Sequence, residues 1–180
     1  MKKSLKQKGF TLIETLVAIT VLILGVTGAY VAATQSITNS IYAKEQVIAF
    51  YLAQEAVEKI RNTRDTNAIS GLNWLHNLAE QGTDPCYFGN SCYGDIFNSP
   101  NGQPFNQCSG AGACPDLYQD PTTGFYSYNS SAPNIDSGYN REIVLTQINA
   151  HEVEILVTVS WSKGTITRTF RVQENLYQWE

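Results

Sequence analysis

The chain is poor in the residues that most catalytic and metal sites require. It contains two histidines, His76 and His151, which share no ligand spacing with each other or with the cysteines. His151 begins the sequence HEVE, which lacks the second histidine of a zinc-hydrolase helix and lies in a strand pattern. A phosphate-cradling glycine loop, a G-x-S-x-G elbow and a C-x-x-C pair are also absent. These absences argue against an enzyme and predict no cofactor and no metal site.

Basic residues are scarce beyond the first nine positions. Four of the 12 lysines and arginines lie at the very start, as Lys2, Lys3, Lys6 and Lys8. The rest of the chain therefore carries 8 basic against 16 acidic residues, a net charge of −8. A body this acidic argues against direct nucleic-acid binding through phosphates.

Charge is almost absent from residues 10–33, FTLIETLVAITVLILGVTGAYVAA, where Glu14 is the one charged residue. About 20 apolar residues span the hydrocarbon core of a bilayer as a helix, so this run is long enough. The preceding lysines predict a cytoplasmic start and place the chain after Ala33 outside. A secretory signal is cut after its apolar core, whereas the small residue here, Gly9, precedes the core. Cleavage at Gly9 would leave the helix in the mature protein.

Glu14 is anomalous within this run. A carboxylate inside a spanning helix costs roughly 2.5–3.5 kcal/mol on insertion scales, and such residues are functional candidates by default. The alternative is that the spanning segment begins one turn later, with Glu14 in the headgroup zone beside the lysines. The residue and its position alone leave both interpretations open.

Residues 8–14, KGFTLIE, resemble the processing site of type IV prepilins and type II secretion pseudopilins. In that family a membrane peptidase cuts after the glycine and methylates the new N-terminal residue. The resemblance implies that Gly9 ends a leader, that Phe10 becomes the methylated N-terminus and that Glu14 serves assembly. The close match covers about 30 residues, and residues 51–64 are similar to the second half of the helix in minor pilins.

The resemblance implies a structural subunit, a minor pilin or pseudopilin of a type IV pilus or a type II secretion-like filament. Its partners would be other pilin or pseudopilin subunits, the prepilin peptidase and an inner-membrane assembly platform. It would cross the inner membrane once, with its C-terminal domain outside, and then enter a pilus or pseudopilus on the cell surface or in the periplasm. The kind of pilus, secretion or competence system is left open.

Two other functions compete with this one. The first is a single-span envelope protein whose outer domain binds a ligand or partner without polymerising. The second is a secreted enzyme behind an uncleaved anchor, against which the missing catalytic motifs count. A simple anchor has no use for a carboxylate at Glu14, whereas a subunit does. The free amine of a neighbour's Phe10 can pair with Glu14, and such a pair in low dielectric fixes register during assembly.

The helix is expected to continue beyond the membrane. No proline lies between Phe10 and Arg64, although many pilins carry one in the spanning helix. Gly25 and Gly28 either weaken the helix locally or let a neighbouring helix pack closely, and the sequence leaves both interpretations open. An apolar stripe follows at spacings of three, four or seven, formed by Ile37, Ile41, Ile48, Leu52, Ala56 and Ile60.

These patterns divide the chain into a leader at residues 1–9, a spanning half-helix at 10–33, an amphipathic outer half-helix at 34–64 and a globular head at 65–180. In the head, leucines spaced three apart predict a short helix over 72–80, with Trp74 in the core or as a lid. Residues 81–138 are rich in Gly, Pro, Asn, Ser, Asp and Tyr and predict a long loop region with short strand character at 125–128.

Four cysteines lie inside that loop region: Cys86, Cys92, Cys108 and Cys114. An even number in an oxidising compartment predicts two disulfides. A structureless loop this long is unusual in a compact domain unless it is functional or cross-linked. The four cysteines can be paired in three ways. The pairing Cys86–Cys92 with Cys108–Cys114 is favoured because each of these bridges closes only a short loop. A zinc site is the rival interpretation, but C-x5-C is wider than the usual structural zinc spacing.

The same region holds two further candidate features. Asp95, Asp116, Asp120 and Asp136 lie in loops where calcium could bind, but no spaced motif supports a site and solvated carboxylates are favoured. Five tyrosines supply amphipathic contact area for partner recognition or, as the slightly favoured alternative, cover the sheet edge: Tyr87, Tyr93, Tyr118, Tyr126 and Tyr128.

The last third of the chain predicts antiparallel strands over 139–180. Along residues 153–161, every second residue is apolar and is expected to face inward: Val153, Ile155, Val157, Val159 and Trp161. A turn at 162–164 leads into 165–172, and 142–148 supplies a third strand. The expected fold class is α+β, with the outer half of the long helix packed on a small antiparallel sheet and a disulfide-stapled loop region between them.

Overall fold

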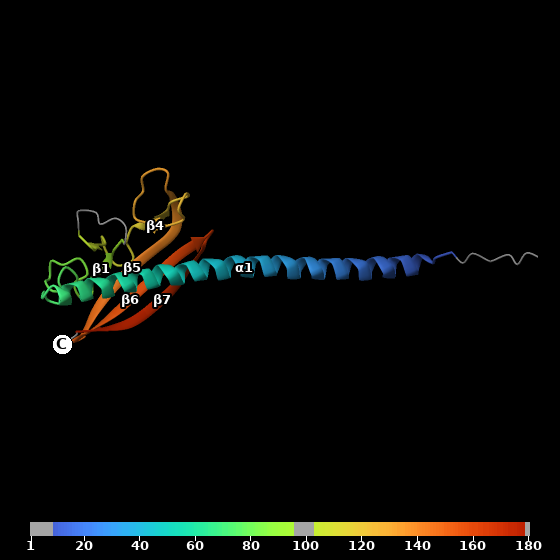
Figure 1. Ribbon diagram of the computed structural model, residues 1–180. Coiled ribbons are helices and arrows are strands. Elements are labelled where there is room, and N and C mark those ends of the chain that lie inside the picture. The colour runs from blue at the N-terminus through green and yellow to red at the C-terminus, as the bar shows by residue number, and fades with distance from the viewer. Residues whose placement is uncertain (1–8, 96–102, 179–180) are drawn as a thin grey trace, which may run out of the picture. The chain divides into compact units, whose positions relative to one another are not determined.

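The structure is a computed structural model, and it describes residues 9–95 and 103–178 (Figure 1). Two compact units divide between Glu45 and Gln46. The described chain contains a single long helix followed by seven strands, namely α1 (Leu12–Ile69), β1 (Ser91–Tyr93), β2 (Asn106–Gln107), β3 (Asp116–Gln119), β4 (Tyr126–Ser127), β5 (Ile135–Asn149), β6 (Glu152–Lys163) and β7 (Ile166–Tyr177). The expected α+β fold, with a long N-terminal helix packed on an antiparallel sheet, is confirmed.

Helix α1 ends five residues later than the sequence predicts, at Ile69 instead of residue 64. The end is a Schellman motif: the N–H of Leu72 donates to the Asn67 carbonyl and that of Gly71 to the Ala68 carbonyl. Gly71 has φ 69°, a left-handed conformation that glycine adopts without steric cost. This glycine therefore sets where the helix stops.

The second unit buries one face of α1 against the sheet. The buried apolar residues of this face are mostly small, and they are Ala49, Leu52, Ala53, Ala56, Val57 and Ile60. Alanine at three of these positions lets the helix backbone approach the strands closely. The predicted stripe packs on the head from Ile48 onward, whereas Ile37 and Ile41 are 62% and 42% exposed.

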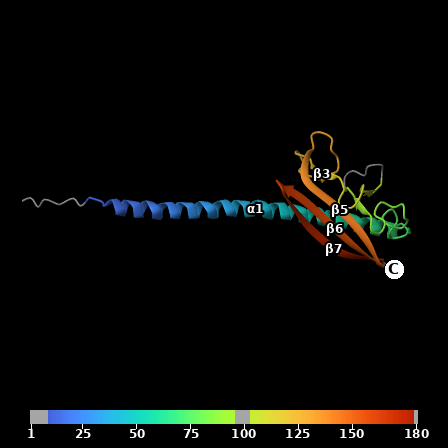
Figure 2. The same ribbon diagram turned by 180° about the vertical axis from the view of Figure 1, so that it is seen from behind.

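The sheet is built around three long antiparallel strands, with β5 paired to β6 and β6 paired to β7. The predicted hairpin is confirmed, and the residues expected to face inward on β6 are all buried: Val153, Ile155, Val157, Val159 and Trp161. The teal part of α1 lies across these three strands in Figure 1 and again from behind in Figure 2. The core of the head is therefore a helix-on-sheet layer.

The region 81–138 is more ordered than predicted. It contains β1 to β4 and the first residues of β5, and all four short strands join the sheet on the side of β5 away from β6. Their partners lie far away in the sequence, as in the pairing of Ser91 with Val144 and of Leu117 with Tyr139. The predicted strand character at 125–128 is confirmed by β4, whereas β1 to β3 are too short to show a periodicity that sequence patterns could reveal.

The predicted helix over 72–80 is wrong, because this segment forms successive turns. The amide of Asn67, near the end of α1, donates to the carbonyls of Trp74 and His76 and so removes them from helical pairing. Asn77 has φ 59°, which interrupts a right-handed helix. Trp74 is nevertheless buried in the core, which is one of the two positions expected for this side chain.

Candidate processing and assembly site

The candidate cleavage bond lies outside regular structure. Gly9, Phe10 and Thr11 precede α1, and all three are exposed. The Phe10 side chain is 76% exposed, and the space around the Gly9 α-carbon is open. Exposed backbone outside regular structure is the preferred place for proteolytic cleavage, and the Gly9–Phe10 bond lies in such a segment. Residues 1–8 of the expected leader lie outside the described residues.

Thr11 caps the helix directly after the candidate cleavage bond. Its Oγ1 accepts a hydrogen bond from the Glu14 N–H at 3.4 Å, and its carbonyl accepts from the N–H groups of Glu14 and Thr15. Glu14 therefore occupies the third position of the helix, where a carboxylate interacts favourably with the helix dipole. The spacing T-x-x-E of a capping box was visible in the sequence and gives Glu14 a local structural role that the sequence reasoning missed.

The N-terminal part of α1 has the length and composition of a membrane span, with a mean hydropathy of 2.3 over 18 residues. Large apolar side chains are exposed all around it, including Leu12 at 83%, Leu22 at 66% and Leu24 at 71%. An apolar surface of this kind requires lipid or other helices to cover it.

The hydroxyl groups within this segment are satisfied inside the helix. Thr15 donates to the Leu12 carbonyl at 2.8 Å and Thr20 donates to the Val17 carbonyl at 2.8 Å. Such internal bonding is what hydrocarbon surroundings demand of a polar side chain. The helix continues through Gly25 and Gly28 without interruption.

The four cysteines form the two local pairs that the sequence favoured. Cys86 is joined to Cys92 and Cys108 to Cys114, with Cα–Cα distances of 5.1 and 4.7 Å. The first bridge belongs to the apolar core, whereas the second closes a small surface loop. Because all four cysteine sulfurs are paired in disulfides, this structure does not support the rival zinc interpretation for them.

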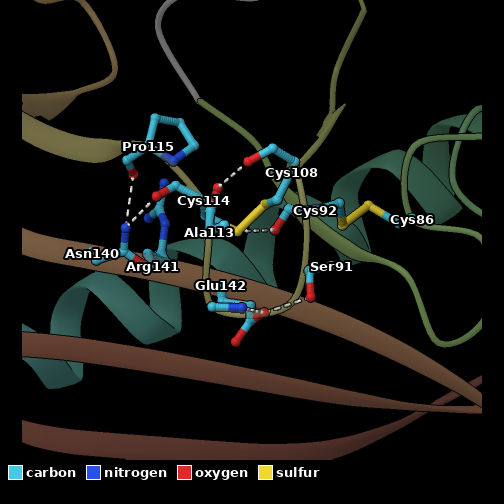
Figure 3. Close-up of a disulfide and its surroundings, with 12 residues drawn as sticks. Cys86, Ser91, Cys92, Cys108, Ala113, Cys114, Pro115, Asn140, Arg141 and Glu142 are labelled. Atoms are coloured by element: carbon cyan, nitrogen blue, oxygen red, sulfur yellow. Dashed lines mark hydrogen bonds between the residues drawn. A yellow bond between two sulfur atoms is a disulfide. The ribbon is translucent and has the colours of Figure 1, made fainter.

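Glu142 on β5 anchors the loop closed by Cys108 and Cys114 (Figure 3). Its Oε1 accepts from the Ser91 hydroxyl at 2.5 Å and from the Gly112 N–H at 2.7 Å. One carboxylate thus connects β5 to the residue that begins β1 and to the disulfide loop. The same strand supplies Asn140, whose amide donates to the carbonyls of Cys114 and Pro115.

Arg141, between those two residues on β5, is a buried positive charge at the centre of the head, with a side chain 1% exposed. Its guanidinium donates to the Leu52 carbonyl and to Glu55 on α1, each at 3.0 Å, and to the Gly94 carbonyl at 2.7 Å. Burial lowers the pKa of Arg141, but Tyr128 and Glu55 raise it by more, so that the guanidinium stays charged.

The other candidate residues lie in separate places. Asp95 accepts from the Tyr128 N–H at 3.0 Å, Asp116 from the Asn140 side chain, Asp120 from the Thr122 N–H and Asp136 from the Gly138 N–H. Each carboxylate therefore organises its own turn or strand. Within residues 9–95 and 103–178, no three His, Cys, Asp or Glu side chains are grouped to hold a metal ion.

The loop tyrosines pack largely on the head itself. The rings of Tyr93 and Tyr128 are 4.7 Å apart, and those of Tyr126 and Tyr139 are 6.0 Å apart. Tyr87 is the most exposed of the group, and its ring contacts Phe88. These contacts favour the covering role of the tyrosines over partner recognition. The part of this region at residues 96–102 lies outside the described residues.

Residues 4–30 match the family model described as the prokaryotic N-terminal methylation motif. The chain carries the hallmark of type IV prepilin- and pseudopilin-like proteins. The match spans the candidate cleavage bond, the helix cap and Glu14. Comparisons with curated proteins and with solved structures gave no match. The methylation motif and the apolar helix together indicate a pilin-like subunit with single-pass membrane anchoring, and the proteins that carry this motif are structural rather than catalytic.

Proposed function

We propose that this chain is a minor pilin or pseudopilin that a prepilin peptidase cuts after Gly9 and methylates on Phe10, and that then assembles into a filament through α1. The observation that carries the proposal is the coincidence of three features within the matched motif: an accessible Gly9–Phe10 bond, a helix capped directly after it, and Glu14 in the first turn of an exposed apolar helix. The head would lie outside the inner membrane, and the assembly platform and other subunits would be its partners.

Glu14 has two functions in this proposal. In the single chain it stabilises the start of α1 at the positive end of the helix dipole. In the filament it pairs with the α-amine that cleavage creates on Phe10 of a neighbouring subunit. A charge pair in low dielectric need not add net stability, but it penalises every register in which one partner is left alone.

The mature N-terminus tests the processing step. Peptide mass spectrometry of the protein from its native membrane should find chains that begin at Phe10 and carry one added methyl group. Chains that begin at Met1, or that are cut near Ala33, would refute the proposal.

Substitution of Glu14 tests the assembly step separately from processing. Glu14→Val should insert and be cut normally, because the apolar run is only lengthened, but it should enter filaments poorly in cells without the wild-type chain. Thr11→Val is the matched control, since it removes the side-chain cap but keeps the carboxylate. If Thr11→Val lowers filament incorporation as much as Glu14→Val does, Glu14 acts only as a helix-start residue.

A further inference from the structure

A groove runs along the head between α1 and β7. Its volume is about 650 Å³, and Phe50, Val57 and Val172 supply its apolar part. Phe50 is 38% exposed, and its ring meets that of Phe170 edge-on at 5.9 Å. Strand β7 is also an edge of the sheet, because among the described residues it pairs with β6 alone. An aromatic and aliphatic groove at such an edge is a surface that a partner can cover.

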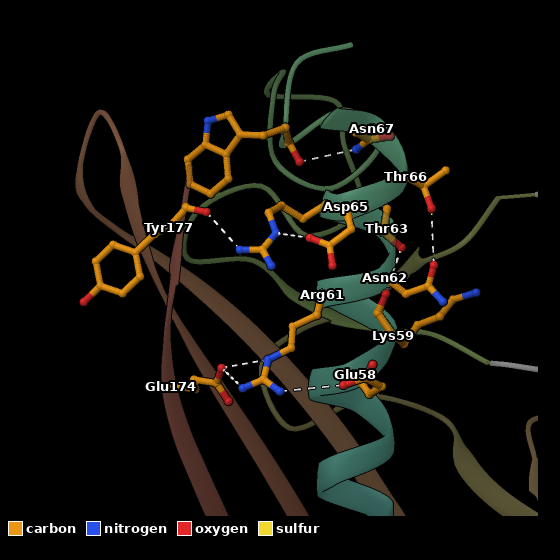
Figure 4. Close-up of polar contacts among 12 residues, drawn as sticks. Glu58, Lys59, Arg61, Asn62, Thr63, Asp65, Thr66, Asn67, Glu174 and Tyr177 are labelled. Carbon is orange, nitrogen blue, oxygen red and sulfur yellow. Dashed lines mark hydrogen bonds and ion pairs between the residues drawn. The ribbon is translucent and has the colours of Figure 1, made fainter. Parts of the chain in front are cut away.

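One end of the groove carries a net negative charge. Arg61 forms an ion pair with Glu174 and lies 3.7 Å from Glu58, so that two carboxylates share one guanidinium (Figure 4). The Glu58 side chain is 69% exposed. The fitting occupant therefore combines apolar side chains with a basic one.

The chain itself carries a segment of this chemistry. Residues 34–45 of α1, called the neck here, follow the candidate span and so lie beyond the hydrocarbon core. Ile37, Ile41 and Lys44 are spaced by four and three residues, which places them on one side of the helix. Both isoleucines and Lys44 are exposed. Burying an exposed isoleucine removes apolar surface from water, so contact of the neck with an apolar surface is favourable.

We infer that the groove between α1 and β7 binds the neck of a second copy of this chain, with Ile37 and Ile41 against Phe50 and Val172 and with Lys44 beside Glu58. This inference rests on the proposed filament function and specifies which surfaces meet in it. A contact between the neck of one subunit and the head of another covers the apolar surface that membrane lipid does not reach.

Disulfide trapping in the full-length protein tests the contact. The cysteines of the described chain are all paired, so two introduced thiols can be followed without interference. Cells that co-express Ile41→Cys and Val172→Cys chains should give a cross-linked dimer on mild oxidation. Ile41→Cys with Gln173→Cys is the control, because Gln173 is the next residue of β7 and faces the opposite side of the sheet. Equal trapping of both pairs, or trapping of Val172→Cys on another protein, would overturn the inference.

A charge exchange gives an independent readout. Lys44→Glu and Glu58→Lys should each lower the filament fraction about two- to fivefold, the range expected for an exposed ion pair, and the double variant should restore it. If filaments form but neither the disulfide cross-link nor the rescue by the double variant is seen, the neck contact is wrong and the proposed function is unaffected. A chain that is not cut after Gly9 and never multimerises would overturn both.

Discussion

Arg141 connects segments that are distant in the sequence. Its guanidinium reaches two groups on α1, a carbonyl beyond β1 and the hydroxyl of Tyr128, whose ring centre lies 5.6 Å away. Removing one member of a buried charge pair leaves the other uncompensated, which costs about 3–5 kcal/mol. Here the residue left behind would be Glu55.

Arg141→Met should therefore lower the free energy of unfolding of the fragment 46–180 by about 3–5 kcal/mol in urea titrations. Arg171→Met is the control, since Arg171 is exposed on β7 and its loss should change stability by less than about 0.5 kcal/mol. Similar losses for both variants would mean that the buried charge makes no special contribution.

Tyr128 gives the head a dependence on alkaline pH. Burial raises the pKa of its hydroxyl above 10.0, and the nearby Arg141 offsets this only in part. The folded protein thus holds this proton more tightly than the unfolded chain. The corresponding stability is complete below about pH 10 and is lost as the pH rises through the folded pKa.

The free energy of unfolding of the fragment 46–180 should consequently fall above about pH 10, and less steeply in Tyr128→Phe. At pH 7 the same variant should be less stable by about 0.5–1.5 kcal/mol, because the hydroxyl no longer bonds to Arg141. Tyr126, whose pKa burial also raises, remains to titrate in both proteins. Parallel curves for the two proteins above pH 10 would contradict this account.

Among the elements, the two disulfides form a natural pair for comparison. Each bridge joins cysteines six residues apart, so the loop-closure contribution of each is similar, about 2 kcal/mol. Their surroundings differ, because Cys86 and Cys92 are fully buried in the core cluster and Cys108 and Cys114 are each 7% exposed outside it.

Replacing Cys108 and Cys114 by alanine should therefore cost about 2 kcal/mol in the fragment 46–180. The same change at Cys86 and Cys92 should cost 1–2 kcal/mol more, roughly the cost of the cavity left by two buried sulfurs. Denaturant titrations of the two double variants under oxidising conditions measure the difference. A larger loss of unfolding free energy on replacing Cys108 and Cys114 would show that their loop contributes more to stability than the packing of the buried bridge.

The elements also show what the sequence could reveal. Alternation along Val153–Trp161 predicted a strand because one face of it is buried, and the stripe from Leu52 predicted the packed face of α1. The short strands β1 to β3 had no local signal, because strands β1 and β3 pair with β5 far along the chain, whereas β4 lies within the predicted strand segment 125–128. Glu14 was found from its charge in an apolar run, whereas the buried role of Arg141 had no local signal, since an arginine in a strand is usually exposed.

At the scale of the whole molecule, the division between Glu45 and Gln46 separates an apolar helix from a head with its own core. The fragment 46–180 should therefore be soluble and monomeric, whereas the full chain should require a membrane or detergent. Light scattering of the fragment, together with thiol titration after denaturation, checks this. Four reactive thiols, or an oligomer at micromolar concentration, would contradict a self-sufficient head.

The loop between Cys108 and Cys114 has a practical consequence for the assembled particle. Its residues 109–113 are small and exposed, and its two ends are held 4.7 Å apart by a covalent bond. A foreign peptide inserted after Ala111 would begin and end at nearly the same point, so its own conformation would pull little on the strands beneath. If the subunits polymerise, every copy would then present that peptide at a regular spacing, and the filament would become a scaffold for multivalent display.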